Sequence, residues 1–471
     1  MVFADLFFLY FFMPVCLLMY FISKNTAYRN VVLIFFSLVF YAWGQPIGVL
    51  FLLFTTVLDY FNGRIIGKYK DRLPAKFAVA ASLIINLGLL AFFKYSGFVV
   101  ENINALFNLT LESPAKTLPI GISFYTFRTI SYIIDCYWGK VKPQKNFGKH
   151  LMYMSLFPAI TAGPIVRYET VEDQIDSRKI KLEDISAGLS KIILGIAKKV
   201  IVANNLSTVV TSLFGDFDSG YSLIGKQSMA GTWLGIISVA LWYYFDFSGY
   251  SDIAIGLGRL FGFKFNENFN YPFICKNIAE FWQRWHISLG TFFRDYLLYL
   301  PIFGKRRQYA SLFLVWFCTG LWHGASWNFI FWGLYYGIFI FIEQKIGKKK
   351  MKKIPLLITH IYSKIVIVIG FGIFYFETLG SLGNYFKSLV GFNGLIDSKT
   401  KLLLMNNLWL FVVAILFTMP IVKKLKEVMY KKQGTLILAN SMGIVINVAL
   451  LLVSSLLLVD STNNAFLYFR F

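Results

Sequence analysis

Apolar segments separated by short polar loops follow one another along the whole chain. They occupy residues 3–22, 31–43, 47–60, 77–93, 118–135, 186–213, 228–245, 360–377, 402–422 and 436–459. A helix needs about 20 predominantly apolar residues to cross a bilayer, so the shorter segments must tilt or be supported by neighbouring helices. The pattern predicts an all-α polytopic membrane protein with about ten spanning helices.

Two further apolar segments, 151–166 and 310–342, have basic residues on both sides and break the alternation of inside and outside loops. Pro158 and Pro164 interrupt the first of them. Irregular backbone at membrane depth is tolerated only where protein buries it or where it lines a cavity. We therefore expect 151–166 to be re-entrant, and 310–342 to be a helix pair that passes into the membrane and returns.

The composition agrees with a membrane protein. Of the 471 residues, 57% are hydrophobic, 19% are aromatic and only 15% are charged, and the mean hydropathy is +0.61. The net charge is +22, and its Lys and Arg residues concentrate in the loops, as the positive-inside rule and anionic lipid headgroups produce. No basic soluble module is present, so nucleic-acid binding is not expected.

The order of apolar segments and basic loops predicts the topology. The first basic residue, Lys24, follows the first apolar segment, which places the N-terminus outside the cytoplasm. The last apolar segment follows the lysines of 423–432, which places the tail 460–471 outside as well. No internal repeat or linker divides the chain, so we expect one membrane domain over 1–471.

The cysteines do not predict a bonded framework. They are Cys16, Cys136, Cys275 and Cys318, scattered and mostly in or beside apolar segments. Such residues are usually buried small hydrophobes. Neither a disulfide framework nor a metal site is predicted.

His323 stands in an otherwise membrane-grade segment, 310–342, beside Trp322 and shortly before Asn328. Trp322 and Asn328 are candidates for contact with substrate along a substrate path. An ionisable group at that depth is costly unless it faces a protein interior or a wet cavity. Histidine is also the side chain best placed to take and return protons near neutral pH. Either it is a core histidine bonded to a neighbouring helix, or it is a catalytic group at the floor of a cytoplasmic cavity.

A second group lies in the stretch 281–289. If this stretch is one helix, Trp282 and His286 share a face at i, i+4, and Trp285 shares a face with Leu289 in the same way. An interfacial amphipathic helix explains the tryptophans and Arg284 by itself. It does not explain His286 on the aromatic side, where a buried active-site group would lie.

The stretch 245–252, Phe-Asp-Phe-Ser-Gly-Tyr-Ser-Asp, ends an apolar segment with carboxylates and hydroxyls. Asp246, Ser248 and Tyr250 are candidates for lining a substrate path. The alternative is that these groups cap a helix and satisfy broken backbone. The glycines that follow lack the spacing and the preceding strand of a dinucleotide-binding turn.

Five motifs in this order resemble the membrane-bound O-acyltransferase superfamily, and more narrowly its bacterial alginate and peptidoglycan O-acetyltransferase branch. They are Phe245–Asp252, Glu267–Pro272, Phe281–Leu289, Arg294–Tyr296 and Leu321–Ala325. The resemblance implies a multi-pass enzyme of the bacterial cytoplasmic membrane with a central catalytic tunnel. It implies that acetyl-CoA donates an acetyl group, without a bound cofactor, to a cell-surface polysaccharide. It also implies that His323 matches the essential histidine and His286 the second polar position.

The residues suit such chemistry. A hydroxyl is a poor nucleophile until a base removes its proton, and a neutral imidazole can do so. The oxyanion of the intermediate needs a donor, for which His286, Trp322 and the amides near Gly324 are candidates. The basic, aromatic cytoplasmic face is expected to bind the phosphates and adenine of coenzyme A.

The tail resembles this branch too, because chains in it tend to end in a Phe-x-Tyr-Phe pattern. Tyr468 is then a candidate first acceptor, whose acetyl ester an extracytoplasmic Ser-His-Asp (SGNH-like) O-acetyltransferase collects for the glycan. A phenol, with an ordinary pKa of about 10, is easier to deprotonate than a sugar hydroxyl. The alternative is an aromatic anchor in the membrane interface.

Two other functions remain open on the sequence. One keeps the chemistry but transfers D-alanine from a carrier protein to teichoic acid. The other, of a different class, is a polyprenol-sugar transporter or flippase, which also has many spans and buried polar groups. A transporter is expected to show paired broken helices in related halves, and no such symmetry is visible.

Overall fold

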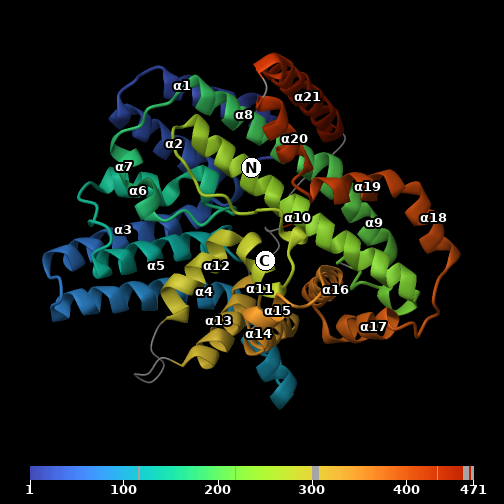
Figure 1. Cartoon of the computed structure of the whole chain (residues 1–471). Coiled ribbons are helices and arrows are strands. Elements are labelled where there is room, and N and C mark those ends of the chain that lie inside the picture. The colour runs from blue at the N-terminus through green and yellow to red at the C-terminus, as the bar shows by residue number, and fades with distance from the viewer. Residues whose placement is uncertain (115–116, 218, 300–306, 432, 460–465, 468–471) are drawn as a thin grey trace. The chain divides into compact units, whose positions relative to one another are not determined.

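The computed structural model describes residues 1–114, 117–217, 219–299, 307–431, 433–459 and 466–467. All regular structure within these ranges is helical, which confirms the predicted all-α class (Figure 1). The contacts divide the chain into two compact units. The first comprises Met1–Ile192, Tyr250–Glu267 and Ser461–Phe471, and the second comprises Ile193–Gly249 and Asn268–Asp460. A single functional domain over 1–471 stays a prediction.

The first unit contains the N-terminal helices. They are η1 (Phe8–Phe12), α1 (Met13–Phe21), α2 (Thr26–Gly44), α3 (Pro46–Lys68), α4 (Leu73–Phe107), α5 (Ile122–Trp138), α6 (Phe147–Ser155), η2 (Phe157–Ala159) and α7 (Tyr168–Asp176). Two long helices contribute residues to both units, α8 (Leu182–Ala197) and α10 (Met229–Leu260).

The second unit contains the remaining helices, several of them short. They are η3 (Lys198–Ala203), α9 (Asn204–Phe214), η4 (Ile224–Lys226), η5 (Pro272–Ile274), α11 (Ile278–Arg284), α12 (Ile287–Phe293), η6 (Arg294–Leu298), α13 (Gln308–His323), α14 (Trp327–Ile346), α15 (Lys348–Met351), α16 (Leu356–Tyr375), α17 (Leu379–Leu389), α18 (Ser398–Asn406), α19 (Leu408–Phe417), α20 (Ile421–Tyr430) and α21 (Gln433–Val459).

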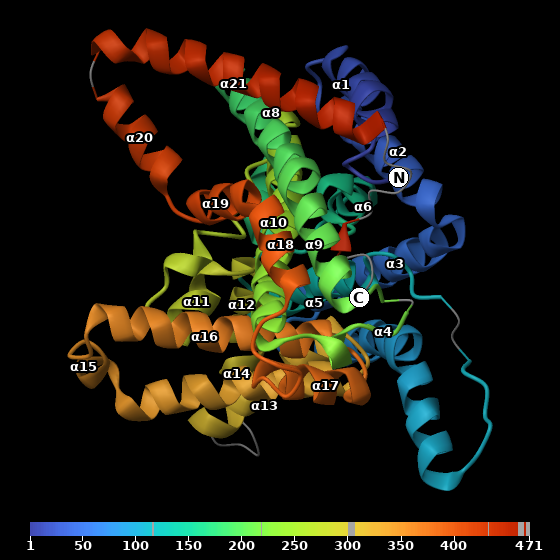
Figure 2. The same ribbon diagram turned by 90° about the vertical axis from the view of Figure 1, so that its right-hand side faces the viewer.

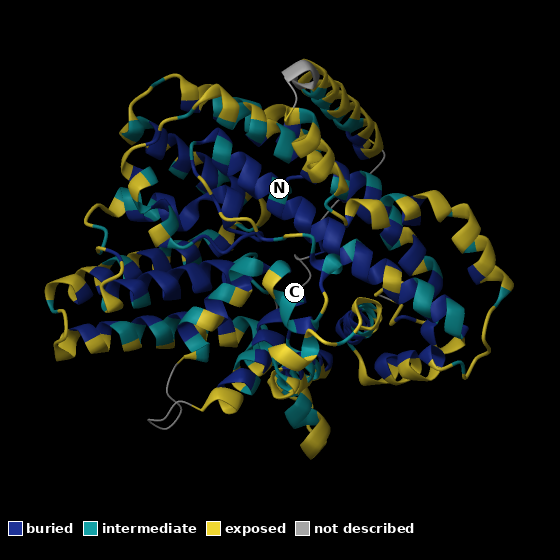
Figure 3. Cartoon of the chain, in the orientation of Figure 1, coloured by how far each residue is buried: buried dark blue, intermediate teal, exposed yellow. Residues whose placement is uncertain are grey.

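Six helices within the described ranges are long and apolar enough to cross a membrane: α2, α3, α4, α14, α16 and the Ile437–Val459 part of α21. The pair α18 and α19, bent by 61°, makes a seventh if it is one span. The number is lower than the expected ten in part because other apolar segments form shorter helices, such as Phe8–Phe21. Exposed apolar positions cover α21, as on a lipid-facing helix (Figure 3).

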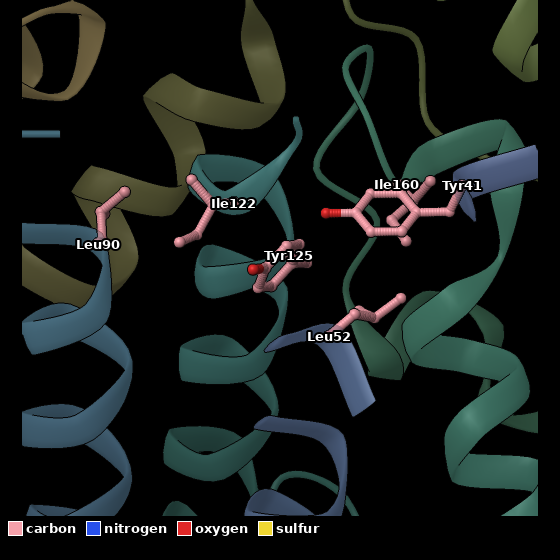
Figure 4. Packing of buried hydrophobic residues seen from close by; sticks show 6 residues of the cluster. All are labelled: Tyr41, Leu52, Leu90, Ile122, Tyr125 and Ile160. Carbon is pink, nitrogen blue, oxygen red and sulfur yellow. The ribbon is translucent and has the colours of Figure 1, made fainter. Parts of the chain in front are cut away.

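The core of the first unit joins α2, α3, α4 and α5 to the segment that follows α6. Figure 4 shows its buried cluster of Tyr41, Leu52, Leu90, Ile122, Tyr125 and Ile160. The Tyr41 hydroxyl donates a hydrogen bond to the carbonyl of Ile120 at 2.8 Å. The polar end of a buried tyrosine is thereby satisfied.

The segment 156–166 between α6 and α7 is largely irregular, yet all of its residues are buried. Its carbonyls are held from α5, because the guanidinium of Arg128 donates to the Ala159 oxygen at 3.4 Å. Gly121 permits the close approach, since a Cβ there would lie 2.5 Å from the Ile160 oxygen and its φ is +76°. Irregular backbone buried in protein is what the sequence predicts here. The side from which the segment enters the membrane stays a prediction.

The predicted helix pair over 310–342 is present as α13 and α14. Gly320 faces Gly333, and a Cβ added to Gly337 would lie 3.3 Å from that of Trp316, so the two helices run antiparallel and close together. A Cβ on Gly320 or Gly333 would overlap the opposite backbone. Figure 2 shows α16 alongside this pair, with α15 joining α14 to α16.

Candidate active site

His323 is the last residue of α13 and is buried, with 6% of its surface exposed. Aromatic rings surround it. The ring centroids of Trp332 and Phe374 lie 5.0 and 5.1 Å from that of the imidazole, and the ring of Trp322 lies 5.0 Å away. The histidine at the turn of the helix pair is thus enclosed in protein.

The turn after His323 is tied to α16 through Asn328. Its side-chain amide donates to the carbonyls of Phe374 at 2.9 Å and Ile373 at 3.3 Å. The Ser326 hydroxyl bonds the Asn328 side-chain oxygen. These bonds fix the start of α14 and hold Phe374 against His323. Asn328 therefore positions the pocket, and its predicted contact with substrate stays a prediction.

The backbone around His286 differs from the single helix expected from the sequence. The stretch 281–289 is not one helix, because α11 ends at Arg284 and α12 begins at Ile287. His286 lies between them with φ +44°, in the left-handed region. Trp282 and His286 consequently do not share a helix face at i, i+4. A non-glycine residue in this conformation is strained and needs support from its surroundings.

Asn268 supplies that support. Its carbonyl accepts the Ile287 amide at 3.0 Å, and its side-chain oxygen accepts the Ser288 hydroxyl at 2.9 Å. The same oxygen lies 3.3 Å from Nδ1 of His286. Asn268 belongs to a motif that the sequence showed, but its role was not predicted. His286 is 2% exposed, and burial lowers its pKa below the ordinary value, so its ring is neutral at physiological pH.

One indole contacts both histidines. The ring of Trp322 lies 5.0 Å from that of His323 and 5.8 Å from that of His286, centroid to centroid. Phe247 of α10 closes the other side of His286 at 4.7 Å. Two buried imidazoles beside one tryptophan can provide a proton acceptor and a hydrogen-bond donor.

Trp282 links α11 to the helix pair. Its ring meets those of Trp316 at 5.0 Å, Trp332 at 5.3 Å and Tyr336 at 4.9 Å. Trp332 in turn contacts His323. The indole N–H of Trp282 is buried and has no hydrogen-bond partner within the described part of the chain.

The other two candidates on this stretch are engaged in packing and bonding. Trp285 stacks on Phe281 at 5.5 Å and contacts Phe371 of α16. Arg284 pairs with Glu280 at 2.9 Å and donates to the Asn270 carbonyl at 3.1 Å. Both residues hold α11 to its neighbours.

The α10 motif reveals a buried ion pair. Asp246 lies 2.7 Å from Nζ of Lys199, and their side chains are 1% and 6% exposed. Lys199 belongs to η3, a π-helical segment, and such segments are frequent at functional sites. Ser248, two residues after Asp246, is also buried. The sequence did not predict the role of Lys199, because its partner Asp246 lies on another helix.

Tyr250 belongs to the first unit, in which its hydroxyl lies 2.6 Å from the Thr161 hydroxyl. Tyr468 lies outside the described residues, so its predicted role as acceptor is untested. The structure thus gathers His286, His323, Trp282 and Trp322 in the second unit.

A cavity of about 790 Å³ opens in the second unit between α11, α14, α15 and α16. Three lysines line it, Lys276, Lys348 and Lys352, and none of them forms an ion pair in the described part of the chain. Gln308 also lines it, at the start of α13. From there α13 runs roughly 22 Å to His323 at 1.5 Å per residue. The cavity and the buried histidine therefore lie at opposite ends of the helix pair.

The chain is similar to known membrane acyltransferases. Residues 144–376 match the model of the membrane-bound O-acyltransferase family. A probable alginate O-acetylase of Pseudomonas syringae is 37% identical over 83% of this chain and 76% of its own length. A peptidoglycan O-acetyltransferase of Helicobacter pylori is 32% identical over 82% and 79%. A teichoic acid D-alanyltransferase of Bacillus subtilis is 32% identical over 50% of this chain and 62% of its own length.

Proposed function

The chain belongs to the membrane-bound O-acyltransferase family, in the branch of the alginate and peptidoglycan O-acetyltransferases, and from this premise we propose its reaction. It takes an acetyl group from cytosolic acetyl-CoA and passes it across the membrane for O-acetylation of a cell-surface polysaccharide. Membership in an acyltransferase family favours this function over transport.

Acetyl transfer is favoured over D-alanyl transfer by how much of the chain each relative matches. The two O-acetylating relatives align with more than four fifths of it, at 83% and 82%. The D-alanyltransferase aligns with 50%. The observation that carries the proposed mechanism is that His323 and His286 both lie against the ring of Trp322.

In the proposed reaction, His323 accepts the proton of the acceptor hydroxyl as its oxygen bonds to the thioester carbon. The carbon–sulfur bond then breaks, and the proton passes to the departing thiolate to give free coenzyme A. The tetrahedral oxyanion that precedes this step needs a donor within hydrogen-bond reach. A neutral His286 can donate, as can the Trp322 indole or the amides near Gly324.

The lysine-lined cavity is the proposed dock for the phosphates of coenzyme A. Its two carboxylates are already engaged, Glu280 with Arg284 and Glu343 with backbone amides, so the lysines leave it positively charged. Arginine and lysine are the usual partners of phosphate groups. The acetyl end then extends along α13 and α14 toward His323.

On the far side, Tyr468 is the proposed first acceptor, and an SGNH-like partner moves the group from its phenyl ester to the glycan. The bacterial cytoplasmic membrane is the proposed location, with both termini outside.

The test uses inside-out vesicles that contain the full chain and acetyl-CoA labelled in the acetyl group. Label is expected on the protein itself, and release of coenzyme A is expected to match it. Label that appears only from D-alanyl carrier protein, or none from acetyl-CoA, contradicts the proposed donor.

A further inference from the structure

Glu343 is a buried carboxylate near the C-terminal end of α14, 8% exposed, that also borders the lysine-lined cavity. One of its oxygens accepts the amide of Ile278 at 2.7 Å, and the other accepts the amide of Ala279 at 3.0 Å. The hydroxyl of Tyr362, from α16, donates to it at 3.2 Å. A single side chain thus bonds the first turn of α11 to both α14 and α16.

Asn277 is the N-cap residue of α11, and its side-chain oxygen accepts the Glu280 amide at 2.7 Å. The first N–H groups of a helix have no partner within the helix itself. Here Glu343 and Asn277 satisfy three of them. Because these amides are already bonded, the groups left to bind an anion in the cavity are its lysines.

What α11 carries makes this attachment relevant to catalysis. The helix brings Trp282 against Trp316, Trp332 and Tyr336, and the chain leaves it directly into His286. A helix of two turns is far too short to be stable alone, so its position depends on tertiary contacts. Glu343 provides charged hydrogen bonds, which are the strongest of these contacts.

We infer that Glu343 is a positioning residue: its carboxylate fixes α11 on α14 and α16 and thereby sets Trp282 and His286 beside the acyl-transfer site. Its effect on transfer rests on the proposed function, whereas its effect on α11 does not. Nothing in the inference requires Glu343 to touch substrate.

Cys275 reports the attachment without any reaction. It is fully buried, lies three residues before α11, and its carbonyl accepts Nζ of Lys364 at 2.7 Å. The experiment changes the other three cysteines to Ala and follows maleimide labelling of Cys275 in membranes. Cys275 is expected to be protected in the otherwise unchanged chain and labelled in Glu343→Ala, with Glu343→Asp in between.

The matched control is Gln344→Ala, since Gln344 borders the same cavity but is exposed and makes no bond to α11. Protection of Cys275 is expected to persist there. In transfer assays, Glu343→Ala is expected to lower kcat by roughly 100-fold, as displacement of catalytic groups does, while KM for acetyl-CoA changes by less than about threefold. Partial recovery of kcat in Glu343→Asp supports positioning.

Equal protection of Cys275 in Glu343→Ala and the parent chain overturns the inference, and so does labelling with an unchanged kcat. A raised KM with an unchanged kcat also overturns it, because that pattern places Glu343 in donor binding. If the parent chain transfers nothing from acetyl-CoA, the proposed function fails, and the labelling pattern alone then supports or overturns the inference.

Discussion

The ring of Phe466 meets the ring of Tyr250 edge-on, with centroids 4.9 Å apart and an angle of 90° between the planes. Phe466 is 1% exposed and the following Leu467 is 6% exposed. The tail therefore enters the protein immediately before Tyr468. An aromatic anchor in the lipid interface would leave these two side chains facing lipid, whereas both are buried. The role of Tyr468 itself stays a prediction.

Replacement of Tyr468 by Phe is expected to abolish O-acetylation of the surface polysaccharide, because it removes the acceptor hydroxyl and keeps the aromatic ring. The measurement is ester content of the glycan in cells that carry only the variant. Phe469→Tyr serves as a control for changes in the tail that retain Tyr468. Wild-type ester content in Tyr468→Phe would show that the tail is only an anchor.

His323→Ala is expected to abolish transfer while the protein remains folded and inserted, because no other base lies in the predicted position. His286→Ala is expected to reduce it strongly but less completely, since a donor or orienting group typically contributes about 10²–10³-fold. Initial rates of coenzyme A release in vesicles distinguish the two. A His323→Ala variant that keeps more activity than His286→Ala would reverse the assignment of base and donor.

These two histidines also show how much of the site could be predicted from the sequence. The apolar segment 310–342 and the basic residues on both sides of it predicted the helix pair that holds His323, because charge and apolar length act locally. The break at His286 was missed, since nothing in 281–289 disfavours a helix. It is imposed by Asn268, 18 residues earlier in the chain. Lys199 and Glu343 were missed for the same reason, because their partners lie on other helices.

The pair formed by Lys199 and Asp246 offers a third prediction. Lys199→Met leaves a buried carboxylate without its cation, and losses of this kind are typically about 3–5 kcal/mol. The double variant Lys199→Met/Asp246→Leu is expected to recover most of the melting temperature in detergent, because no charge stays unpaired. If it recovers stability but not transfer, Asp246 also serves the reaction. A double variant less stable than both single variants would contradict the pairing.

The fourth prediction concerns pH and His150, a buried residue of α6 whose ring lies 4.9 Å from that of Tyr132. Burial lowers its pKa to about 3. The unfolded chain takes up the proton near pH 6.5, so below that pH the unfolded state binds more protons and stability falls. At pH 5 the loss from one such group is about 2 kcal/mol.

The melting temperature in detergent is therefore expected to drop between pH 7.5 and pH 5, and to drop less in His150→Phe. Burial also lowers the pKa of His286, so part of the drop in melting temperature is expected to remain in His150→Phe. Identical pH slopes in the variant and the parent chain would show that His150 is not held neutral by the fold.

The last prediction tests the orientation of the helix pair. Lys68 ends α3 and Lys349 lies in α15, after α14 has returned from the turn at His323. The positive-inside rule places both on the cytoplasmic side, whereas Asn463, outside the described residues, is expected on the other. Cysteines introduced at the first two positions should react with an impermeant maleimide only in inside-out vesicles, and one at position 463 only in intact cells. Because α13 and α14 are antiparallel, positions 308 and 349 must label from the same side. If position 349 labels from outside, the cavity at these helix ends faces away from the cytosol, and its lysines cannot be the dock for acetyl-CoA.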